Sequence, residues 1–200
     1  MGALVQRFRR EHALVRRACG CLAALADDVE GGEPLDLGAA CDLLHFFELF
    51  VDEAHQRKEE EVLFLALLRT GRLTRHVGEL LSEHCAEARG LGRIREALTQ
   101  VASGEPGSAQ RFAQLAEAYT RAQLEHAEKE DQLLLPLAEE LLDEGEQADL
   151  DVRCAAIDAL LELDSRTELL RAIEHIARTH RPPTDAAPRE NPPARRDGDD

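Results

Sequence analysis

Two segments of the sequence repeat one pattern of histidine, lysine and carboxylate residues. The pattern His-x-x-Lys-Glu-(Glu/Asp)-x-(Val/Leu)-Leu begins at His55 and again at His126, 71 residues later. A Glu-His pair at residues 11–12 recurs at residues 83–84, and each pair is followed by an arginine. Independent coincidences would not recur at nearly one spacing. We therefore interpret the chain as two helix–loop–helix halves that carry the same chemical groups.

Each long repeat places its histidine and a glutamate on one face of a helix. Residues four apart on an α-helix differ by about 40° in direction, so His55 points with Glu59 and His126 points with Glu130. Apolar residues of these helices, Leu133 among them, are expected to point the same way. Four helices then aim four histidines and two glutamates at one interior. The candidate metal ligands are His12, His55, Glu59, His84, His126 and Glu130.

This set of buried groups favours a metal centre. Four imidazoles and two carboxylates in an apolar interior are very costly unless cations neutralise and coordinate them. Two metal ions bridged by the two glutamates are the simplest solution, with two histidines from each half. Nitrogen and oxygen ligands without a thiolate suit iron or manganese, and they can also hold zinc.

Each part of the pattern alone has a simpler interpretation. A single His-x3-Glu on a helix is typical of a surface ion pair, and a lone buried histidine is typical of a hydrogen-bonded core residue. Only the joint repetition favours a metal site.

Asp131, five residues after His126, competes with Glu130 for the ligand position. It lies about 140° from His126, on the shoulder of the helix.

The other histidines have no counterpart in the repeat. His45, His76 and His175 are expected at the surface or rim, and His180 in the tail. Residues 60–61 continue a run of charge that we interpret as a solvated helix face. The five scattered cysteines contain no Cys-x-x-Cys pair, and we interpret them as small buried thiols in a reducing cytosol. They are Cys19, Cys21, Cys41, Cys85 and Cys154.

The elements that must position these residues are long helices. Apolar residues at three- and four-residue spacing fill the stretches between glycine- and proline-containing breaks, and no strand signal is present in the sequence. Helices are predicted at 3–28, 37–69, 74–102, 108–143 and 147–178, the last broken near residues 164–165. The fold class predicted is all-α, an antiparallel up-down four-helix bundle. The bundle is expected over residues 1–145, with a helical extension packed on it at 146–180 and a disordered, proline-rich tail at 181–200.

Composition excludes several classes of partner. With 40 acidic and 24 basic residues the net charge is −16, which argues against nucleic acid and against an anionic membrane surface. No apolar run approaches the ~20 residues of a membrane span. The first ten residues lack the apolar core of a secretory signal, so a cytoplasmic location is expected.

The motifs resemble those of a known family. The residues concerned are His12, the block Phe50-Val51-Asp52-Glu53-Ala54-His55 with Lys58-Glu59-Glu60 and Leu63-Phe64, then Glu83-His84, and His126 with Lys129-Glu130-Asp131. Together they resemble the bacterial hemerythrin-like, or HHE cation-binding, proteins over roughly residues 8–140. The resemblance implies a four-helix bundle around a non-haem, oxo- or hydroxo-bridged pair of iron ions, with the same six residues as ligands.

One departure from the family pattern bears on function. Oxygen-carrying hemerythrins place two histidines four residues apart on the third helix, whereas Leu80 and Ala88 flank His84 at that spacing. Four histidines in place of five argue against reversible oxygen carriage and leave an open position for chemistry or sensing. A ferritin-like centre would instead need Glu-x-x-His, and Asp52 and Gln123 occupy the corresponding positions, of which Gln123 cannot be an anionic ligand.

The resemblance implies a small diatomic or peroxide partner: oxygen, nitric oxide or hydrogen peroxide. Three functions stay open on the sequence. The first is binding or sensing of this species in oxidative-stress handling. The second is a redox enzyme with catalase- or peroxidase-like turnover or nitric oxide reduction. The third is a structural or iron-handling bundle without turnover.

Overall fold

Long helices form where the apolar periodicity runs without interruption. The computed structural model describes residues 2–160 and 163–180, without the side chains of residues 163–166, and all regular structure in these ranges is helical. The first helix is α1 (Ala3–Glu30). The second combines α2 (Leu37–Phe46), the π-helical stretches η1 (Phe47–Gln56) and η2 (Glu59–Phe64), and α3 (Leu65–Arg69). The third is α4 (Thr74–Ala102). The fourth combines α5 (Ser108–Lys129), the π-helical η3 (Glu130–Leu134) and α6 (Leu135–Leu141).

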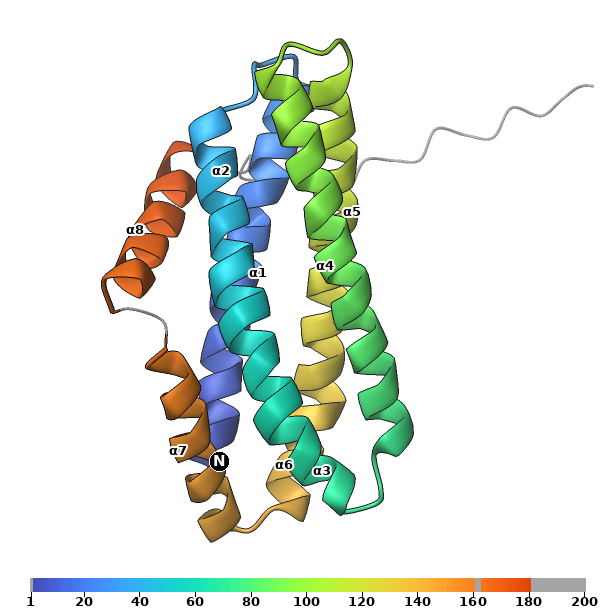
Figure 1. Ribbon diagram of the computed structural model, residues 1–200, viewed down its shortest axis with the longest axis vertical. Coiled ribbons are helices and arrows are strands. Elements are labelled where there is room, and N and C mark those ends of the chain that lie inside the picture. The colour runs from blue at the N-terminus through green and yellow to red at the C-terminus, as the bar shows by residue number, and fades with distance from the viewer. Residues whose placement is uncertain (1, 161–162, 181–200) are drawn as a thin grey trace, which may run out of the picture.

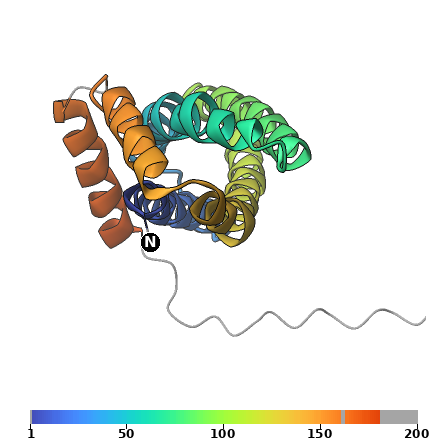
Figure 2. The same cartoon turned by 90° about the horizontal axis from the view of Figure 1, so that it is seen from below.

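These four helices run up and down around a common axis, and two shorter helices lie outside them (Figures 1 and 2). The outer helices are α7 (Glu144–Asp158) and α8 (Leu163–Thr179). In the view along the bundle both lie on the side of α1 and the second helix, and the α4–α5 face lies opposite. The predicted all-α four-helix bundle with an added C-terminal helical segment is therefore confirmed.

The C-terminal segment differs from its prediction in its bounds. It begins at Glu144 because Asp143 and Glu146 form a reciprocal capping box, which satisfies main-chain donors at the helix start. The break comes after Asp158, earlier than residues 164–165. The buried stripe of α7 ends at Ile157. Among the described side chains of α8, Leu169 is the first that is buried. Residues 181–200, predicted to be disordered, lie outside the described residues.

Two apolar clusters fill the bundle, one toward each end. One contains stacked Phe46 and Phe50, with Phe47 edge-on to Tyr119. The other is built around Phe8, residues 62–64 and residues 66–67. The buried polar residues of the repeats lie between these clusters, so the bundle encloses a polar layer within an apolar core.

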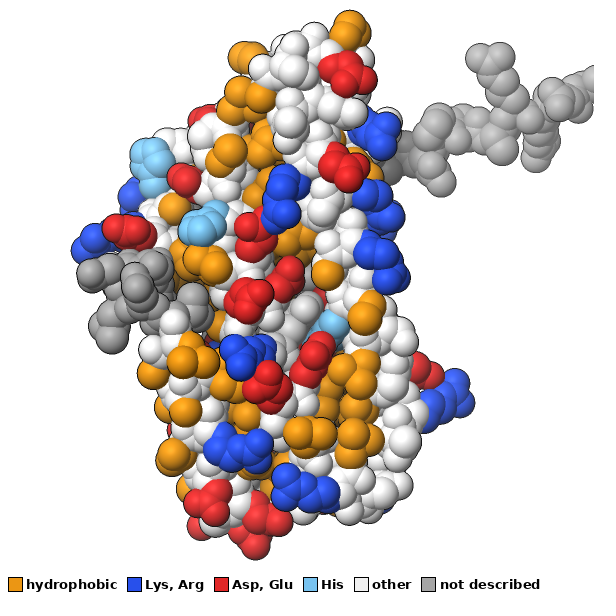
Figure 3. Space-filling model, in the orientation of Figure 1, with side chains coloured by type: hydrophobic (Ala, Val, Ile, Leu, Met, Phe, Trp, Pro, Cys, Tyr) orange, Lys and Arg blue, Asp and Glu red, His pale blue; other side chains and the backbone are white. Residues whose placement is uncertain are grey.

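The surface carries many charged side chains, as the composition of the chain leads one to expect. The face in Figure 3 mixes acidic, basic and hydrophobic side chains. Among the described residues, no helix is both long and apolar enough to cross a membrane.

The π-helical stretches occur in both helices that carry His-x-x-x-Glu. In such stretches the main-chain hydrogen bonds join residues i and i+5. The wider turn changes the side of the helix on which the following side chains lie. In η3 the shift leaves Leu133 42% exposed and buries Leu134 at 1%, so the prediction that Leu133 faces the core is wrong. Pro136 follows closely and lacks the N–H that would bond back into this turn. Leu65 holds the equivalent place in the other half, so proline is not required for the wide turns.

Candidate metal centre

The structure brings all six candidate ligands together in the layer between the apolar clusters. Each is buried, and they come from all four bundle helices. Two groups of potential ligand atoms form, each with its atoms within 4.8 Å of one another. One group is His12, His55, Glu59 and Glu130, and the other is His84, His126, Glu59 and Glu130. Each half of the chain thus supplies one histidine pair, and both groups share the two glutamates.

Glu59 faces both histidine pairs. Its Oε1 lies 3.1 Å from His55 Nε2 and 3.6 Å from His12 Nε2. Its Oε2 lies 3.4 Å from Nε2 of His84, in the other pair. One carboxylate therefore directs one oxygen toward each pair, which is the arrangement of a bridging ligand.

Glu130 also lies between the pairs. Its Oε2 is 3.1 Å from His12 Nε2 and 3.5 Å from His126 Nε2. Across the second pair, Nε2 of His84 is 3.1 Å from Nε2 of His126. All four imidazoles therefore point Nε2 inward.

A carboxylate outside the centre accepts the Nδ1–H of each imidazole. An ionised carboxylate can only accept a hydrogen bond, so Nδ1 carries a proton, and a neutral imidazole then directs the lone pair of Nε2 to the interior. The four distances are 2.8 to 2.9 Å. The pairs are His12–Asp131, His55–Glu11, His84–Glu60 and His126–Glu83.

These outer carboxylates follow the same repeat. Glu11 and Glu83 are the glutamates of the two Glu-His pairs, and Glu60 and Asp131 follow the two candidate glutamate ligands. The interpretation of residue 60 as part of a solvated face is therefore wrong in part. Its side chain is 43% exposed, yet its carboxylate holds His84. Asp131 contacts the outer nitrogen of His12 and belongs to neither inward group.

The repeated lysines hold two of the outer carboxylates, in different surroundings. Lys58 Nζ lies 2.5 Å from Glu11 Oε1, and Lys129 Nζ lies 2.5 Å from Glu83 Oε1. Lys58 is 0% exposed because α7 covers it, with Asp158 Oδ1 2.6 Å away. Lys129 is 55% exposed. The two halves are alike in chemistry and unlike in burial.

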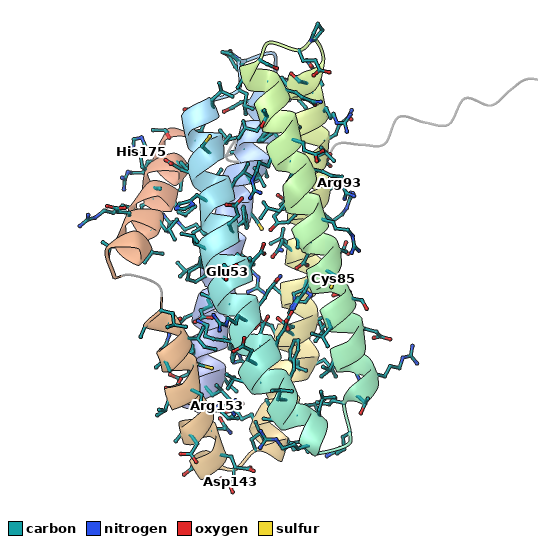
Figure 4. The ribbon with its side chains drawn as sticks, viewed as in Figure 1. Glu53, Cys85, Arg93, Asp143, Arg153 and His175 are labelled. Atoms are coloured by element: carbon teal, nitrogen blue, oxygen red, sulfur yellow. The ribbon has the colours of Figure 1, made fainter. Side chains whose placement is uncertain are left out.

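Helix α7 is anchored over the first half by further polar contacts. Arg7 reaches Asp151 and Asp158 at 2.7 and 2.6 Å. Arg153, labelled in Figure 4, donates to the main-chain carbonyl of Glu61 at 3.0 Å. The appended segment therefore closes the side of the centre that contains Lys58.

The buried polar atoms at the centre are short of partners. His12 Nε2, Glu59 Oε2 and both carboxylate oxygens of Glu130 make no hydrogen bond to any described residue. Buried polar atoms without a partner are costly, and an inward-facing set of four imidazole nitrogens and two carboxylates needs cations. The residues present thus fit a pair of metal ions.

The pKa values of the metal-free centre also indicate that it needs cations. Burial opposes the charged form of His84, but the Glu59 and Glu60 carboxylates outweigh it and raise the pKa of that imidazole to about 9. Burial and the nearby Glu59 carboxylate raise the pKa of Glu130 to about 7. Burial disfavours ionised Glu59, but the surrounding histidines hold its pKa well below its ordinary value. Protons therefore occupy the centre near neutral pH, and a metal ion must displace them.

The predicted positions of the four histidines outside the repeat are only partly right. His45 and His175 are exposed, and His76 is half-buried at the rim. The prediction that His180 belongs to a tail is wrong, because its ring contacts Asp28 at 2.9 Å and Asp36 at 3.3 Å and fixes the end of α8.

All five cysteines are free, but they are not all buried as expected. Cys19, Cys21 and Cys154 are buried, whereas Cys41 and Cys85 are exposed. Cys85 is adjacent to His84 in sequence and points outward from α4 (Figure 4). Neither inward group of potential ligand atoms contains a thiol.

Sequence reasoning missed a second polar layer, one helical turn from the centre. Gln56 donates to Glu87 at 2.8 Å, and Gln123 donates to the Tyr119 hydroxyl at 3.2 Å. Burial, with the Glu87 and Glu53 charges, raises the pKa of Asp52 to about 6. These residues lack the strict repetition of the ligands, so only their helical register relative to the histidines could have indicated them.

Comparison with known proteins agrees with the geometry. The family model of the hemerythrin HHE cation binding domain matches residues 3–138, which include all six candidate ligands and the four bundle helices except for the last three residues of α6. Searches of curated proteins and of solved structures found no match. The family match covers more than half of the chain and the whole of the buried His/Glu centre. The chain therefore belongs to the hemerythrin HHE cation-binding domain family.

Proposed function

We propose that the protein is a non-haem di-iron protein that binds or reacts with a small species such as oxygen, hydrogen peroxide or nitric oxide. The observation that carries the proposal is the sharing of Glu59 and Glu130 between two histidine pairs. Two cations bound in adjacent positions and joined by carboxylates fit this arrangement, and a lone structural cation would leave one pair without a partner.

Iron fits the donor set of the centre. The ligand atoms are imidazole nitrogens and carboxylate oxygens, with no thiolate, which suits iron and manganese and is also compatible with zinc. Two bound irons would supply electron transfer to and from a small oxidant. Family membership supports cation binding.

The protein side chains would hold the centre rigid during such a reaction. The outer carboxylates fix the tautomer and direction of all four imidazoles. Phe64 stacks on His84 with ring centroids 5.7 Å apart, and Phe8 meets His55 edge-on at 5.9 Å. These rings exclude water from the side of the centre facing the second apolar cluster.

Four histidines rather than five favour reaction or sensing over oxygen storage. The third bundle helix supplies His84 alone to the inward groups, so fewer protein ligands than in oxygen carriers surround the metals. We place the function in the handling of oxidative stress in the cytoplasm, a reducing compartment that suits five free cysteines. The second candidate is a redox enzyme that turns over peroxide or reduces nitric oxide.

Stopped-flow spectroscopy separates the two. The iron-loaded, reduced protein is mixed with oxygen and, separately, with hydrogen peroxide, and the optical spectrum and dissolved oxygen are followed. An optical change with oxygen that reverses under vacuum is expected for binding. Rapid evolution of oxygen from peroxide is expected for the enzyme. A spectrum that changes with neither reagent nor with nitric oxide would contradict both and favour a structural or iron-handling bundle.

A further inference from the structure

A groove with a volume of about 280 Å³ opens between α4 and α5, beside the second half of the centre. Its walls include the small residues Ala86 and Gly90 of α4 and Ala118 and Ala122 of α5. Small side chains at these positions leave space between the two helices. At Gly90 an added Cβ would lie 3.2 Å from Cδ2 of the Tyr119 ring, so even one methyl group would press on the groove wall.

The groove reaches inward almost to the candidate ligands. Glu87 and Tyr119 line it although both are buried, so they form its floor. Glu87 Oε1 lies 3.8 Å from Nδ1 of His126. Glu83, which holds the same nitrogen at 2.9 Å, also lines the groove, together with its partner Lys129. The groove therefore leads from solvent to the carboxyl groups beside the outer nitrogen of His126.

The outer side of the first histidine pair is covered by paired charged side chains. Lys58 fills the space behind Glu11 and His55, and α7 covers it through Asp158. On the flank of His12, Asp131 is held by Arg16 at 2.5 Å. The two groups of ligand atoms that share Glu59 and Glu130 thus differ in their access to solvent. The more open group adjoins α4 and α5, on the face opposite α7 and α8 (Figure 2).

The charged and polar groups at the floor of the groove favour an uncharged ligand. Glu83 is paired with Lys129, and Glu87 is the innermost carboxyl group of the groove. Arg93, labelled in Figure 4, lines the groove about 9 Å further along α4 from Glu87. A carboxyl group at the inner end offers no positive charge to an anion and leaves small neutral molecules unhindered.

We propose that the α4–α5 groove is the route by which a small uncharged diatomic or peroxide molecule reaches the His84–His126 side of the centre. This inference rests on the proposed function. The small residues Ala86 and Ala122 keep the route open, and Glu87 and Tyr119 form its inner end. The position next to His84 and His126 is then the one that meets the ligand first.

Filling the mouth of the groove tests this route. Ala86→Leu with Ala122→Leu adds bulk at two exposed positions that belong to neither apolar cluster, so folding should be preserved. Ala88→Leu is the matched control, because Ala88 is exposed on the same helix and does not line the groove. Nitric oxide, a neutral diatomic, is the probe. Its association with and dissociation from the reduced, iron-loaded proteins are followed by stopped-flow spectroscopy, after iron content is measured.

The double variant should bind and release nitric oxide about tenfold more slowly with unchanged equilibrium affinity, because a blocked route slows both directions equally. The control should match the parent. Rates in the double variant equal to the parent's, at equal iron content, would overturn the route and leave the proposed function intact. A parent protein that holds no iron would overturn both. Altered affinity with unaltered association would show that the substitutions act on the centre itself, which also contradicts the route.

Discussion

Removal of the metal is expected to lower the melting temperature of the protein by roughly 10 °C. A ligand present at about a thousand times its dissociation constant stabilises the folded state by about 4 kcal/mol, and 1 kcal/mol shifts the melting temperature of a chain of this size by roughly 2–4 °C. Without cations the buried Glu59 and Glu130 carboxylates and the four imidazoles must protonate, admit water or separate. Differential scanning calorimetry of iron-loaded and chelator-treated protein measures the difference.

The difference should also widen as pH rises from about 6 to 9. In the metal-free protein the pKa of His84 is raised from 6.5 to about 9 and that of Glu130 from 4.5 to about 7. A raised pKa stabilises the fold while the group is protonated. The His84 contribution is full below about 6.5 and is lost as pH rises through 9, and the Glu130 contribution is full below about 4.5 and is lost through 7. Bound metals replace these protons, so the metal-free form loses more stability in this range.

A variant without the site provides the control for calorimetry. His55→Ala removes one inward nitrogen, and chelator should then change its melting temperature much less than that of the parent. Equal melting curves for the iron-loaded and metal-free parent would show that the His/Glu layer is stable without a metal.

Glu130→Ala is expected to weaken metal binding far more than Asp131→Ala. Glu130 directs its carboxylate into both groups of ligand atoms, whereas Asp131 holds the outer nitrogen of His12. Loss of an outer partner typically costs about 10–100-fold in metal affinity, and loss of a shared ligand should cost more than 100-fold. Metal analysis after dialysis against a series of chelator concentrations gives both affinities.

The other half of the chain offers a matched pair for the same test. Glu59→Ala should behave like the variant at Glu130, and Glu60→Ala like the variant at Asp131, since Glu60 holds His84 in the same way. Stronger loss on replacing Asp131 than on replacing Glu130 would show that the aspartate is the ligand and that the two halves are not equivalent.

The sequence predicts the bundle and the inward groups well because both depend on spacing within single helices. Four long helices follow from apolar periodicity, and duplication of His-x-x-x-Glu identifies the groups that meet inside. The π-helical turns could not be predicted, since they arise from packing and main-chain bonding rather than from residue type. For this reason the sequence predicts Leu133 in the core, whereas Leu134 is the buried residue in the structure.

The roles of the outer charges depend on contacts between distant segments. Glu60 and Asp131 look like ordinary solvated carboxylates in sequence, and only the approach of a neighbouring helix reveals that they hold histidines. The burial of Lys58 likewise depends on α7, about a hundred residues away, through Asp158. Both lysines and all the outer carboxylates belong to the repeated motif, so the repetition itself was the available signal.

Iron content per chain tests the central claim most directly. Protein purified from iron-supplemented cells, quantified by amino-acid analysis and inductively coupled plasma mass spectrometry, should hold close to two irons per chain, one for each group of ligand atoms. His55→Ala and His126→Ala remove a ligand from different groups, and each should lower that content. A parent protein with no bound metal, or full iron occupancy in both variants, would contradict the account.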